Sequence, residues 1–323
     1  MDKSFGDVVA LHDISFEVGR GEVVGLLGPN GAGKTTMVHI LSTLTRPDRG
    51  EAWVAGHDVV ADPAAVRRSI MLTGQRVAVD NKLSGFQNLV LFGRLQGLRK
   101  SAARTRAAEL IREFDLEDAA GRRVATYSGG MQRRIDIACG LVVRPEVAFL
   151  DEPTTGLDPR SRQSIWELVD RFKSAGIATL LTTQYLEEAD ALSDRIVLID
   201  HGAIIADGTV DELKRRTGGD YCEFVPVDPK DLPVMAAALG TLLPDENKAA
   251  LSVGTDRVTL PAPDGANTLI NALGRLKDAN IALVDVVLRR PSLDDVFFSL
   301  TTDPATATGP TIAEDRPVAG AAS

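Results

Sequence analysis

Three short segments of this chain carry residues suited to binding and cleaving the phosphates of a nucleotide. The first segment, residues 28–36, contains the pattern G-x-x-x-x-G-K-T and follows an apolar run typical of a buried strand. Its glycines let backbone N–H groups converge on phosphate oxygens, and a helix that begins near Gly33 directs its positive end at the same anion. We expect Lys34 to reach the β- and γ-phosphates and the Thr35 hydroxyl to bind Mg²⁺. The candidate phosphate-binding residues are Gly28, Pro29, Asn30, Gly31, Ala32, Gly33, Lys34, Thr35 and Thr36.

The second segment places two carboxylates at the end of another buried strand. The apolar residues 147–150 are followed directly by Asp151 and Glu152. Because the carboxyl ends of parallel strands share one edge of a sheet, we expect these side chains beside the phosphate loop. Asp151 is predicted to hold Mg²⁺, and Glu152 to orient and polarise the attacking water. An ordinary strand-end turn is the alternative, and the presence of the phosphate loop argues against it.

The third segment is Ser128-Gly129-Gly130, which lies 23 residues (151 − 128) before Asp151. A helix that begins here offers a serine hydroxyl, glycine N–H groups and its positive end to a second anion. Standing alone, the segment would be interpreted as a helix N-cap. The phosphate loop with its acidic pair is one half of a nucleotide site, and the Ser-Gly-Gly helix start is the other half. Their presence on one chain therefore predicts an ATPase that must dimerise to work.

Composition narrows the class of protein. The chain has 323 residues, of which 44% are hydrophobic and 25% charged, as in a soluble globular protein. A net charge of −9 argues against nonspecific binding of nucleic acid. Cys139 and Cys222 are interpreted as reduced thiols rather than as a disulfide or a metal site. The apolar runs are too short to span a bilayer, so we expect any membrane-spanning part to come from another chain.

Buried strands alternate with amphipathic helices over the first two thirds of the chain, which predicts an α/β fold with a mostly parallel sheet. Strands are expected at residues 22–27, 147–150 and 177–182, and a hairpin over residues 194–208 that turns near His201 and Gly202. Residues 84–145 are expected to form a mainly helical subdomain. The helix after the phosphate loop is expected to align Met37, Ile40, Leu41 and Leu44 and to end before Pro47.

A change of character near residues 217–219 predicts a second, smaller domain of α+β type over residues 220–301. Strand patterns at 221–227, 256–260 and 281–288 alternate with helix patterns at 233–243 and 266–279, and Ser292 is expected to start a last helix. Residues 302–323 are rich in Ala, Thr, Pro and Gly, and this composition predicts a disordered tail.

Together these segments resemble the ATP-binding cassette (ABC) proteins. Residues 127–132, Tyr-Ser-Gly-Gly-Met-Gln, are similar to the signature motif of that family, usually written LSGGQ. Gln75, 41 residues (75 − 34) after Lys34, lies where the family has its Q-loop glutamine. Phe5 matches the aromatic residue that stacks on adenine, and Asp158 belongs to a D-loop. The resemblance implies a P-loop NTPase of the ABC cassette type over residues 1–217, which uses ATP and Mg²⁺ and in which Gln75 also contacts both.

The resemblance also implies partners. In the family, Ser128, Gly129 and Gly130 would close on the γ-phosphate held by a second copy, so that two ATP molecules lie between two head-to-tail chains. Polytopic membrane permease subunits would dock on this dimer at the cytoplasmic face of the cell membrane, and the transported substrate would contact those subunits. Nucleic acid is not an expected partner. The alternative is a soluble ABC ATPase that remodels nucleic acid or ribosomes, although such proteins usually carry two cassettes or a long coiled coil.

Three positions depart from the common pattern of the family. Tyr127 replaces Leu and Met131 replaces Gln or Glu, both at the periphery of the phosphate contact. Gln184 occupies the position of the switch histidine, and its neutral amide predicts either a degenerate site or a working site with an uncharged switch. The retained Glu152 favours the working site.

Residues 72–75 (Leu-Thr-Gly-Gln), 127–131 (Tyr-Ser-Gly-Gly-Met) and 182–190 (Thr-Thr-Gln-Tyr-Leu-Glu-Glu-Ala-Asp) resemble one branch of the family, the DrrA-type ATP-binding subunits of daunorubicin/doxorubicin-type efflux systems, in which Gln is common at the switch position. The appendage, which ends in residues 291–297 (Pro-Ser-Leu-Asp-Asp-Val-Phe), is also similar to theirs. This branch implies export of hydrophobic compounds, either drugs or complex lipids. The appendage over residues 220–301 is expected to stabilise the dimer or its membrane partner, or simply to pack against the cassette.

Overall fold

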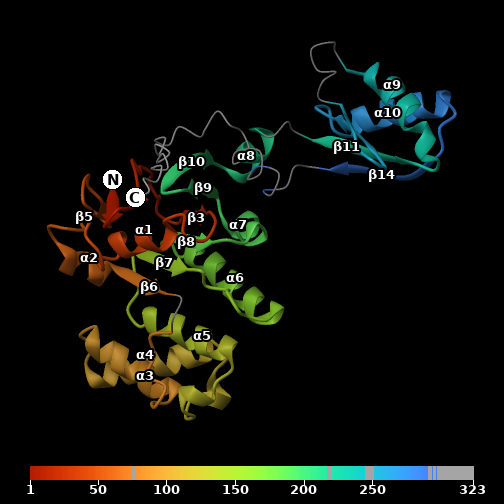
Figure 1. Cartoon of the computed structure of the whole chain (residues 1–323). Helices are drawn as coiled ribbons and strands as arrows, with labels where there is room; N and C mark the ends of the chain where they lie inside the picture. Colours follow the sequence, from red (N-terminus) through yellow and green to blue (C-terminus); the bar gives the residue numbers. More distant parts are fainter. Residues whose placement is uncertain (75–76, 217–219, 244–250, 290–292, 294–295, 297–323) are drawn as a thin grey trace, which may run out of the picture. The chain divides into compact units, whose positions relative to one another are not determined.

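A computed structural model of the chain describes residues 1–74, 77–216, 220–243, 251–289, 293 and 296. The chain divides into two compact units, Met1–Leu213 and Lys214–Ser323, and the division falls within the helix α8 (Val210–Arg216) (Figure 1). None of the helices in the described ranges has the length and the apolar run that crossing a bilayer requires.

A six-stranded sheet forms the centre of the first unit. Its strand order is β10-β9-β3-β8-β7-β6, and every neighbouring pair is parallel except the β9–β10 hairpin. All residues of β3 and β8 are buried, because helices cover both faces of a parallel sheet. The strands are β3 (Val23–Leu27), β6 (Ile70–Thr73), β7 (Val147–Asp151), β8 (Ala178–Thr183), β9 (Arg195–Asp200) and β10 (Ala203–Gly208).

Two hydrophobic clusters fill the two faces of this sheet. On one face, α1 (Lys34–Leu41) packs Met37, Val38 and Ile40 against residues of β3, β7, β8 and β9. On the other face, α6 (Pro159–Ser174) packs Ile165, Leu168, Val169 and Phe172, joined by Leu192 of α7 (Leu186–Leu192). Figure 1 shows α1 and α6 on opposite sides of the strands. Alternate residues of each strand thus enter different cores, as the pleat of a strand requires.

A helical lobe extends from the second cluster (Figure 1). It contains α3 (Gly85–Leu95), α4 (Lys100–Glu113) and α5 (Gly129–Gly140), with short 3₁₀ turns at Glu117–Ala119 and Val124–Thr126. Ser84 and Gln87 form a reciprocal capping box that starts α3. The stripe of Ala107, Leu110, Ile111 and Phe114 expected from the sequence is buried in this lobe.

Smaller elements complete the first unit. They are the hairpin of β1 (Lys3–Phe5) and β2 (Val8–Leu11), the hairpin of β4 (Trp53–Val54) and β5 (His57–Asp58), and the helix α2 (Pro63–Ser69). The expectation that Leu44 continues the helix after the phosphate loop is wrong. The chain turns at Thr43, whose φ is 66°, and Leu44 is 63% exposed. Its N–H then bonds the carbonyl of His39, as at a helix C-terminus that closes with a left-handed residue.

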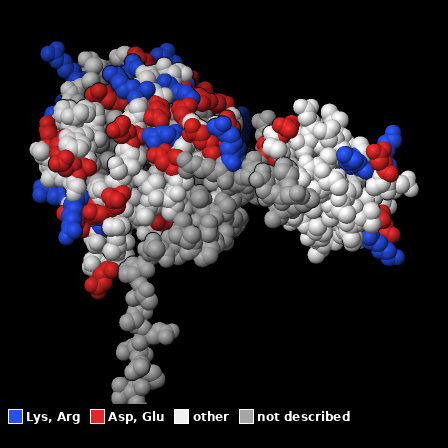
Figure 2. Space-filling model, turned by 90° about the horizontal axis from the view of Figure 1, so that it is seen from above, with Lys and Arg blue, Asp and Glu red and all other residues white. Residues whose placement is uncertain are grey.

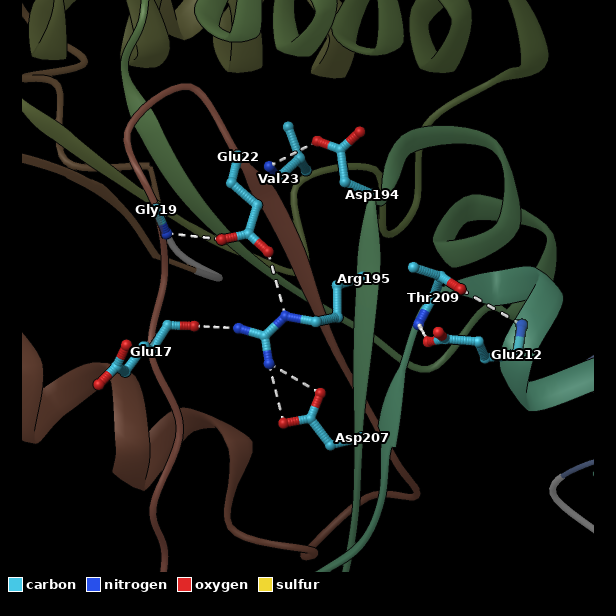
Figure 3. Close-up of polar contacts among 9 residues, drawn as sticks. All are labelled: Glu17, Gly19, Glu22, Val23, Asp194, Arg195, Asp207, Thr209 and Glu212. Carbon is cyan, nitrogen blue, oxygen red and sulfur yellow. Dashed lines mark hydrogen bonds and ion pairs between the residues drawn. The ribbon is translucent and has the colours of Figure 1, made fainter.

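An arginine ties the sheet together at the end remote from the phosphate loop (Figure 3). Arg195, the first residue of β9, donates two 2.8 Å hydrogen bonds to Asp207 of β10 and one of 3.0 Å to Glu22, just before β3. It also donates to the carbonyl of Glu17. The adjacent Asp194 accepts from the N–H of Val23 at 3.0 Å and pairs with Lys173. The hairpin, which turns at His201 and Gly202 as expected, is thereby fixed to the central strand.

The second unit is an α+β structure with its own core. A four-stranded antiparallel sheet has the order β12-β13-β11-β14, and α9 and α10 contribute Met235, Leu239, Ala272 and Leu276 to the cluster that includes Cys222 and Phe224. The elements are β11 (Tyr221–Pro226), a 3₁₀ turn (Pro229–Asp231), α9 (Leu232–Gly240), β12 (Ser252–Val253), β13 (Val258–Pro261), α10 (Ala266–Asp278) and β14 (Leu283–Arg289). Ser292 and the tail 302–323 lie outside the described residues, whereas Leu293 and Val296 are helical and buried.

Charged side chains of both signs cover the visible face of the first unit, whereas the second unit shows few charged side chains on the face drawn in Figure 2. Among the described residues of that face of the first unit, positive and negative groups are interspersed, so they form no continuous basic surface. Proteins that bind nucleic acid usually carry such a continuous basic patch or stripe.

Candidate nucleotide site

The strand order brings two of the three segments singled out from the sequence, the phosphate loop and the acidic pair, to one edge of the sheet. β8 lies between β3, which leads into the phosphate loop, and β7, which ends at Asp151. The register pairs Leu27 of β3 with Thr183 of β8, and Thr182 with Asp151. The last residues of β8 therefore lie between the phosphate loop and the two carboxylates.

The shape of the phosphate loop depends on its glycines. Gly31 and Gly33 have φ values of 85° and 109°, a region that residues with a Cβ rarely adopt. A Cβ on Gly28 would come within 2.2 Å of the carbonyl oxygen of Ile199, and one on Gly33 within 2.6 Å of that of Ala10. The loop is therefore seated directly on the backbone of β9 and β2. It leads into α1, whose free N-terminal N–H groups are suited to an anion.

Lys34 is buried at the start of α1, with 4% of its surface exposed. Its ammonium donates to the carbonyls of Gly28 at 2.7 Å and Pro29 at 2.9 Å. It also lies 4.0 Å from Oε1 of Glu152. Burial lowers the pKa of Lys34, while the charges of Glu152 and Asp151 act in the opposite direction. A desolvated ammonium beside the helix start is suited to phosphate oxygens, which it can bind as a point charge.

The two carboxylates are held by a hydroxyl that the sequence analysis did not single out. Thr182 of β8, which is fully buried, donates to Oδ1 of Asp151 at 2.6 Å. The same oxygen of Thr182 accepts from the N–H of Glu152 at 3.0 Å. Glu152 has a φ of 47°, so the chain turns sharply there and Glu152 extends toward Lys34. A threonine at the end of an apolar strand is ordinary in sequence, and only the pairing of β7 with β8 reveals its role.

Two oxygen donors could hold a magnesium ion. The hydroxyl of Thr35 lies 3.5 Å from Oδ1 of Asp151, which is 98% buried by its neighbours. Mg²⁺ in nucleotide sites usually takes one or two protein oxygens and completes its shell with water and substrate phosphates. The donor set therefore fits this ion. Gln75, the third residue expected to contact the metal, lies outside the described residues.

The signature segment starts α5 in the manner expected. Ser128 is the N-cap and accepts from the N–H of Met131 at 3.3 Å, and a Cβ on Gly129 would meet open space among the described atoms. Gly130 is different, because a Cβ there would come within 2.2 Å of the Ser161 hydroxyl. Ser161 belongs to the start of α6, where its hydroxyl and N–H donate to Asp158 at 2.6 and 3.0 Å and hold the pKa of that carboxyl below its usual range. The start of α5 and the start of α6 are thus in direct contact.

Tyr127, which stands where the family usually has Leu, is buried. Its hydroxyl donates to the carbonyl of Ala119 at 2.7 Å, and a Cβ on Gly85 would come within 2.3 Å of the Tyr127 hydroxyl oxygen. The phenol thus anchors the signature segment to the start of α3. Burial raises its pKa.

A cleft of about 540 Å³ opens between the phosphate loop and the signature helix. Asn30, Glu152 and Gln184 all line it, as does Gly129. Gln184 therefore faces the same space as the acidic residue predicted to activate water. Phe5 of β1 is 53% exposed, with the Lys3 ammonium 5.2 Å from its ring centre, and its partner strand β2 borders the phosphate loop through Ala10.

Residues 11–155 match the ABC transporter family. The chain is 70% identical over 299 residues to the doxorubicin resistance ATP-binding protein DrrA of Mycobacterium tuberculosis strain H37Rv, covering 93% of this chain and 90% of that one. The chain belongs to the DrrA-type ATP-binding subunits of ABC transporters.

Other relatives extend this family. The daunorubicin/doxorubicin resistance ATP-binding protein DrrA of Streptomyces peucetius is 46% identical over 308 residues, covering 94% of this chain and 91% of the other. The Nod factor export ATP-binding protein I of Sinorhizobium fredii is 34% identical over 302 residues, covering 93% and 84%. A solved ATP-binding subunit of an ABC transporter superposes with a TM-score of 0.62 at 31% identity, over 67% of this chain and 90% of that structure.

These relatives confirm the predicted family and the ABC cassette fold. The chain is an ATP-hydrolysing subunit of an ABC exporter, and the soluble alternative that remodels nucleic acid or ribosomes is not favoured. The relatives are named as ATP-binding proteins, and a solved ATP-binding cassette of the same fold, MJ0796, is a dimer bound to ADP and phosphate.

Proposed function

We propose that this subunit drives export of hydrophobic compounds, either drugs of the doxorubicin and daunorubicin type or complex lipids. Two copies would associate head to tail at the cytoplasmic face of the cell membrane and bind separate polytopic permease subunits. The transported compound would contact those permease subunits rather than this chain. The names of the relatives, which describe doxorubicin, daunorubicin and Nod factor export, support this class of cargo.

The observation that carries the proposal is the division of the site into two halves. Lys34, Thr35, Asp151 and Glu152 converge within hydrogen-bonding or ion-pairing distance, so they serve one nucleotide. Ser128 and the N-terminus of α5 form a separate anion site with no acidic residue in its first turn. An ATP molecule bound to Lys34 of one copy is then completed by Ser128 of the other copy, which accounts for both halves.

Within each completed site the side chains take distinct roles. Lys34 and the backbone of residues 28–36 bind the β- and γ-phosphates, and Thr35, Asp151 and Gln75 hold Mg²⁺, which supplies charge neutralisation during phosphoryl transfer. Glu152 orients the attacking water, and Gln184 donates its amide to the γ-phosphate as an uncharged switch. Phe5 stacks on adenine and Asp158 supports the interface between the copies.

The substitution Glu152→Gln tests the division of roles. The amide keeps the size of the side chain but cannot polarise water as a carboxylate does, so the variant is expected to bind ATP without turnover. With Mg²⁺ and ATP it should elute as a dimer in size-exclusion chromatography, whereas Glu146→Gln, at the other end of β7, should behave as wild type. Hydrolysis by Glu152→Gln at the wild-type rate would show that Glu152 is not the catalytic base.

Export is tested separately in the cells that carry this chain. Replacing the native gene by one encoding Lys34→Ala removes the phosphate-binding ammonium and is expected to raise intracellular doxorubicin, which is measured by its fluorescence. Restoring the wild-type chain provides the control. Equal accumulation in the two strains would exclude doxorubicin as cargo, and comparison of extractable lipids between the strains then tests the lipid arm of the proposal.

A further inference from the structure

Arg133 is a buried cation that none of the roles above uses. It lies on α5, five positions (133 − 128) after the signature serine, and only 6% of its surface is exposed. Its guanidinium donates to the carbonyl of Pro153 at 2.9 Å and to that of Asp151 at 3.4 Å. These two carbonyls belong to the residues on either side of Glu152. The signature helix is therefore bonded to the backbone that carries the catalytic carboxylate of its own chain.

The same guanidinium reaches the segment that precedes the helical lobe. Arg133 donates to the carbonyl of Gly74 at 2.8 Å, and its partner Asp136, 3.5 Å away, accepts from the N–H of Ala78 at 2.8 Å. Gly74 and Ala78 flank residues 75–76 in the sequence. One arginine and one aspartate, three residues apart on a helix, thus bond the described residues Gly74 and Ala78 and the end of β7.

The surroundings of Arg133 show why an arginine is needed. The free-energy cost of burying the charged guanidinium is offset by its contact with Asp136 and by the nearby charges of Asp151 and Glu188. Glu188 is itself buried and accepts from the Thr154 hydroxyl at 2.8 Å. All three guanidinium nitrogens donate, to three carbonyls and one carboxylate in total. A planar fork with five N–H donors satisfies such a set, whereas an ammonium on a flexible stem cannot span it.

We propose that Arg133 is a positioning residue that couples the two half-sites of one chain. When the ATP of the second copy engages Ser128, α5 is held in place, and the bonds from Arg133 to Asp151 and Pro153 fix Glu152 for attack on the chain's own ATP. Occupation of one site thereby promotes hydrolysis at the other. This inference rests on the proposed ATP-sandwich dimer.

The test compares Arg133→Lys with Arg134→Lys in the purified full-length chain. Arg134 is the matched control, because it lies on the same helix but donates to the carbonyls of Phe114 and Asp115 within the helical lobe. Arg133→Lys is expected to lower kcat for ATP at least about tenfold while KM changes by less than about threefold, because the phosphate loop is untouched. Arg134→Lys should stay within about threefold of wild type in both constants.

The Hill coefficient for ATP distinguishes a loss of coupling between the two sites from a loss of folded protein. The wild-type ATP dependence is expected to have a Hill coefficient above 1, and Arg133→Lys should bring it to about 1. A merely unstable variant would lower the active fraction and leave the Hill coefficient unchanged. Should Arg133→Lys fail to fold, Asp136→Asn serves in its place, since its amide oxygen still accepts from Ala78 while the counter-charge of Arg133 is removed.

Two results would overturn the proposal. One is an Arg133→Lys protein with wild-type kcat and Hill coefficient, and the other is a wild-type enzyme without cooperativity. Failure of the underlying dimer is distinguishable, because Glu152→Gln alone would then remain monomeric with ATP. If the coupling is correct, the double variant Arg133→Lys with Glu152→Gln still dimerises with ATP, since Arg133 acts after the copies have met.

Discussion

The hydroxyl of Thr182 makes a sharp prediction because it holds both acidic residues at once. The substitution Thr182→Val keeps the shape of the side chain and removes the 2.6 Å hydrogen bond to Asp151. The hydroxyl of Thr35, at 3.5 Å from the same oxygen, is at the limit of hydrogen-bonding distance and replaces only a small part of that bond. The N–H of Glu152 loses the Thr182 hydroxyl but keeps the Thr182 carbonyl at 3.1 Å. The loss therefore falls mainly on the buried carboxylate of Asp151.

A hydrogen bond to a charged group contributes about 1.5–3 kcal/mol, and its loss here leaves a carboxylate oxygen unsatisfied. We expect Thr182→Val to lower the free energy of unfolding of the first unit by about 2–3 kcal/mol. Displacement of the Asp151 carboxylate, which is predicted to hold Mg²⁺, should also reduce kcat by about 10- to 100-fold, since small displacements of catalytic groups are costly. Thr182→Ser keeps the hydroxyl and should cost only about 1 kcal/mol for the lost methyl group.

Urea unfolding followed by tryptophan fluorescence measures the effect on stability. Both tryptophans of the chain, Trp53 and Trp166, belong to the first unit, so the signal reports that unit alone. ATPase assays on the same samples give kcat. Equal midpoints and equal rates for Thr182→Val and wild type would refute the argument that this hydroxyl positions the carboxylates.

Three further predictions concern other parts of the molecule. Gly130→Ala is expected to abolish ATP-dependent dimerisation in the Glu152→Gln background, because the new methyl group displaces the start of α6. Gly121→Ala is the control, since its methyl group meets open space and should leave dimerisation unchanged. A Gly130→Ala protein that still dimerises would contradict this prediction. Burial raises the pKa of Cys139 and Cys222. Mass spectrometry should therefore detect no reaction of either thiol with maleimide at pH 8 until urea unfolds the unit that contains it. Rapid labelling of the folded protein would show that the thiols are accessible. Gln184→His should change kcat by less than about tenfold, and a gain of several orders of magnitude would mean that the native switch is crippled.

The sequence predicted best what depends on local pattern. The phosphate loop after a buried strand, the acidic end of β7 and the N-cap at Ser128 each follow from residues that are adjacent in the chain. The hairpin at His201 and Gly202 was equally clear from its strand-turn-strand pattern, and both turn residues adopt positive φ in the structure. Leu44 was placed wrongly, because apolar spacing continued past the point where Thr43 closes the helix.

What escaped the sequence analysis depends on partners that are distant in the chain. Thr182 acts on Asp151, 31 residues earlier, and Arg133 acts on Gly74, 59 residues earlier. Neither a threonine ending a strand nor an arginine in a helix is unusual by itself. Their roles become visible only when strand order and the packing of α5 are known, because hydrogen-bond partners are set by the tertiary fold.

The position of β3 in the sheet has a consequence for biosynthesis. Its two neighbours, β8 and β9, begin at residues 178 and 195, long after the phosphate loop, the signature segment and the acidic pair have been translated. A nascent chain that ends before residue 178 therefore contains β3 without either strand that pairs with it. Such long-range pairing delays folding and leaves apolar strands exposed meanwhile. The phosphate loop and the acidic pair can be brought together only after β8 has left the ribosome, because β8 lies between β3 and β7 in the sheet.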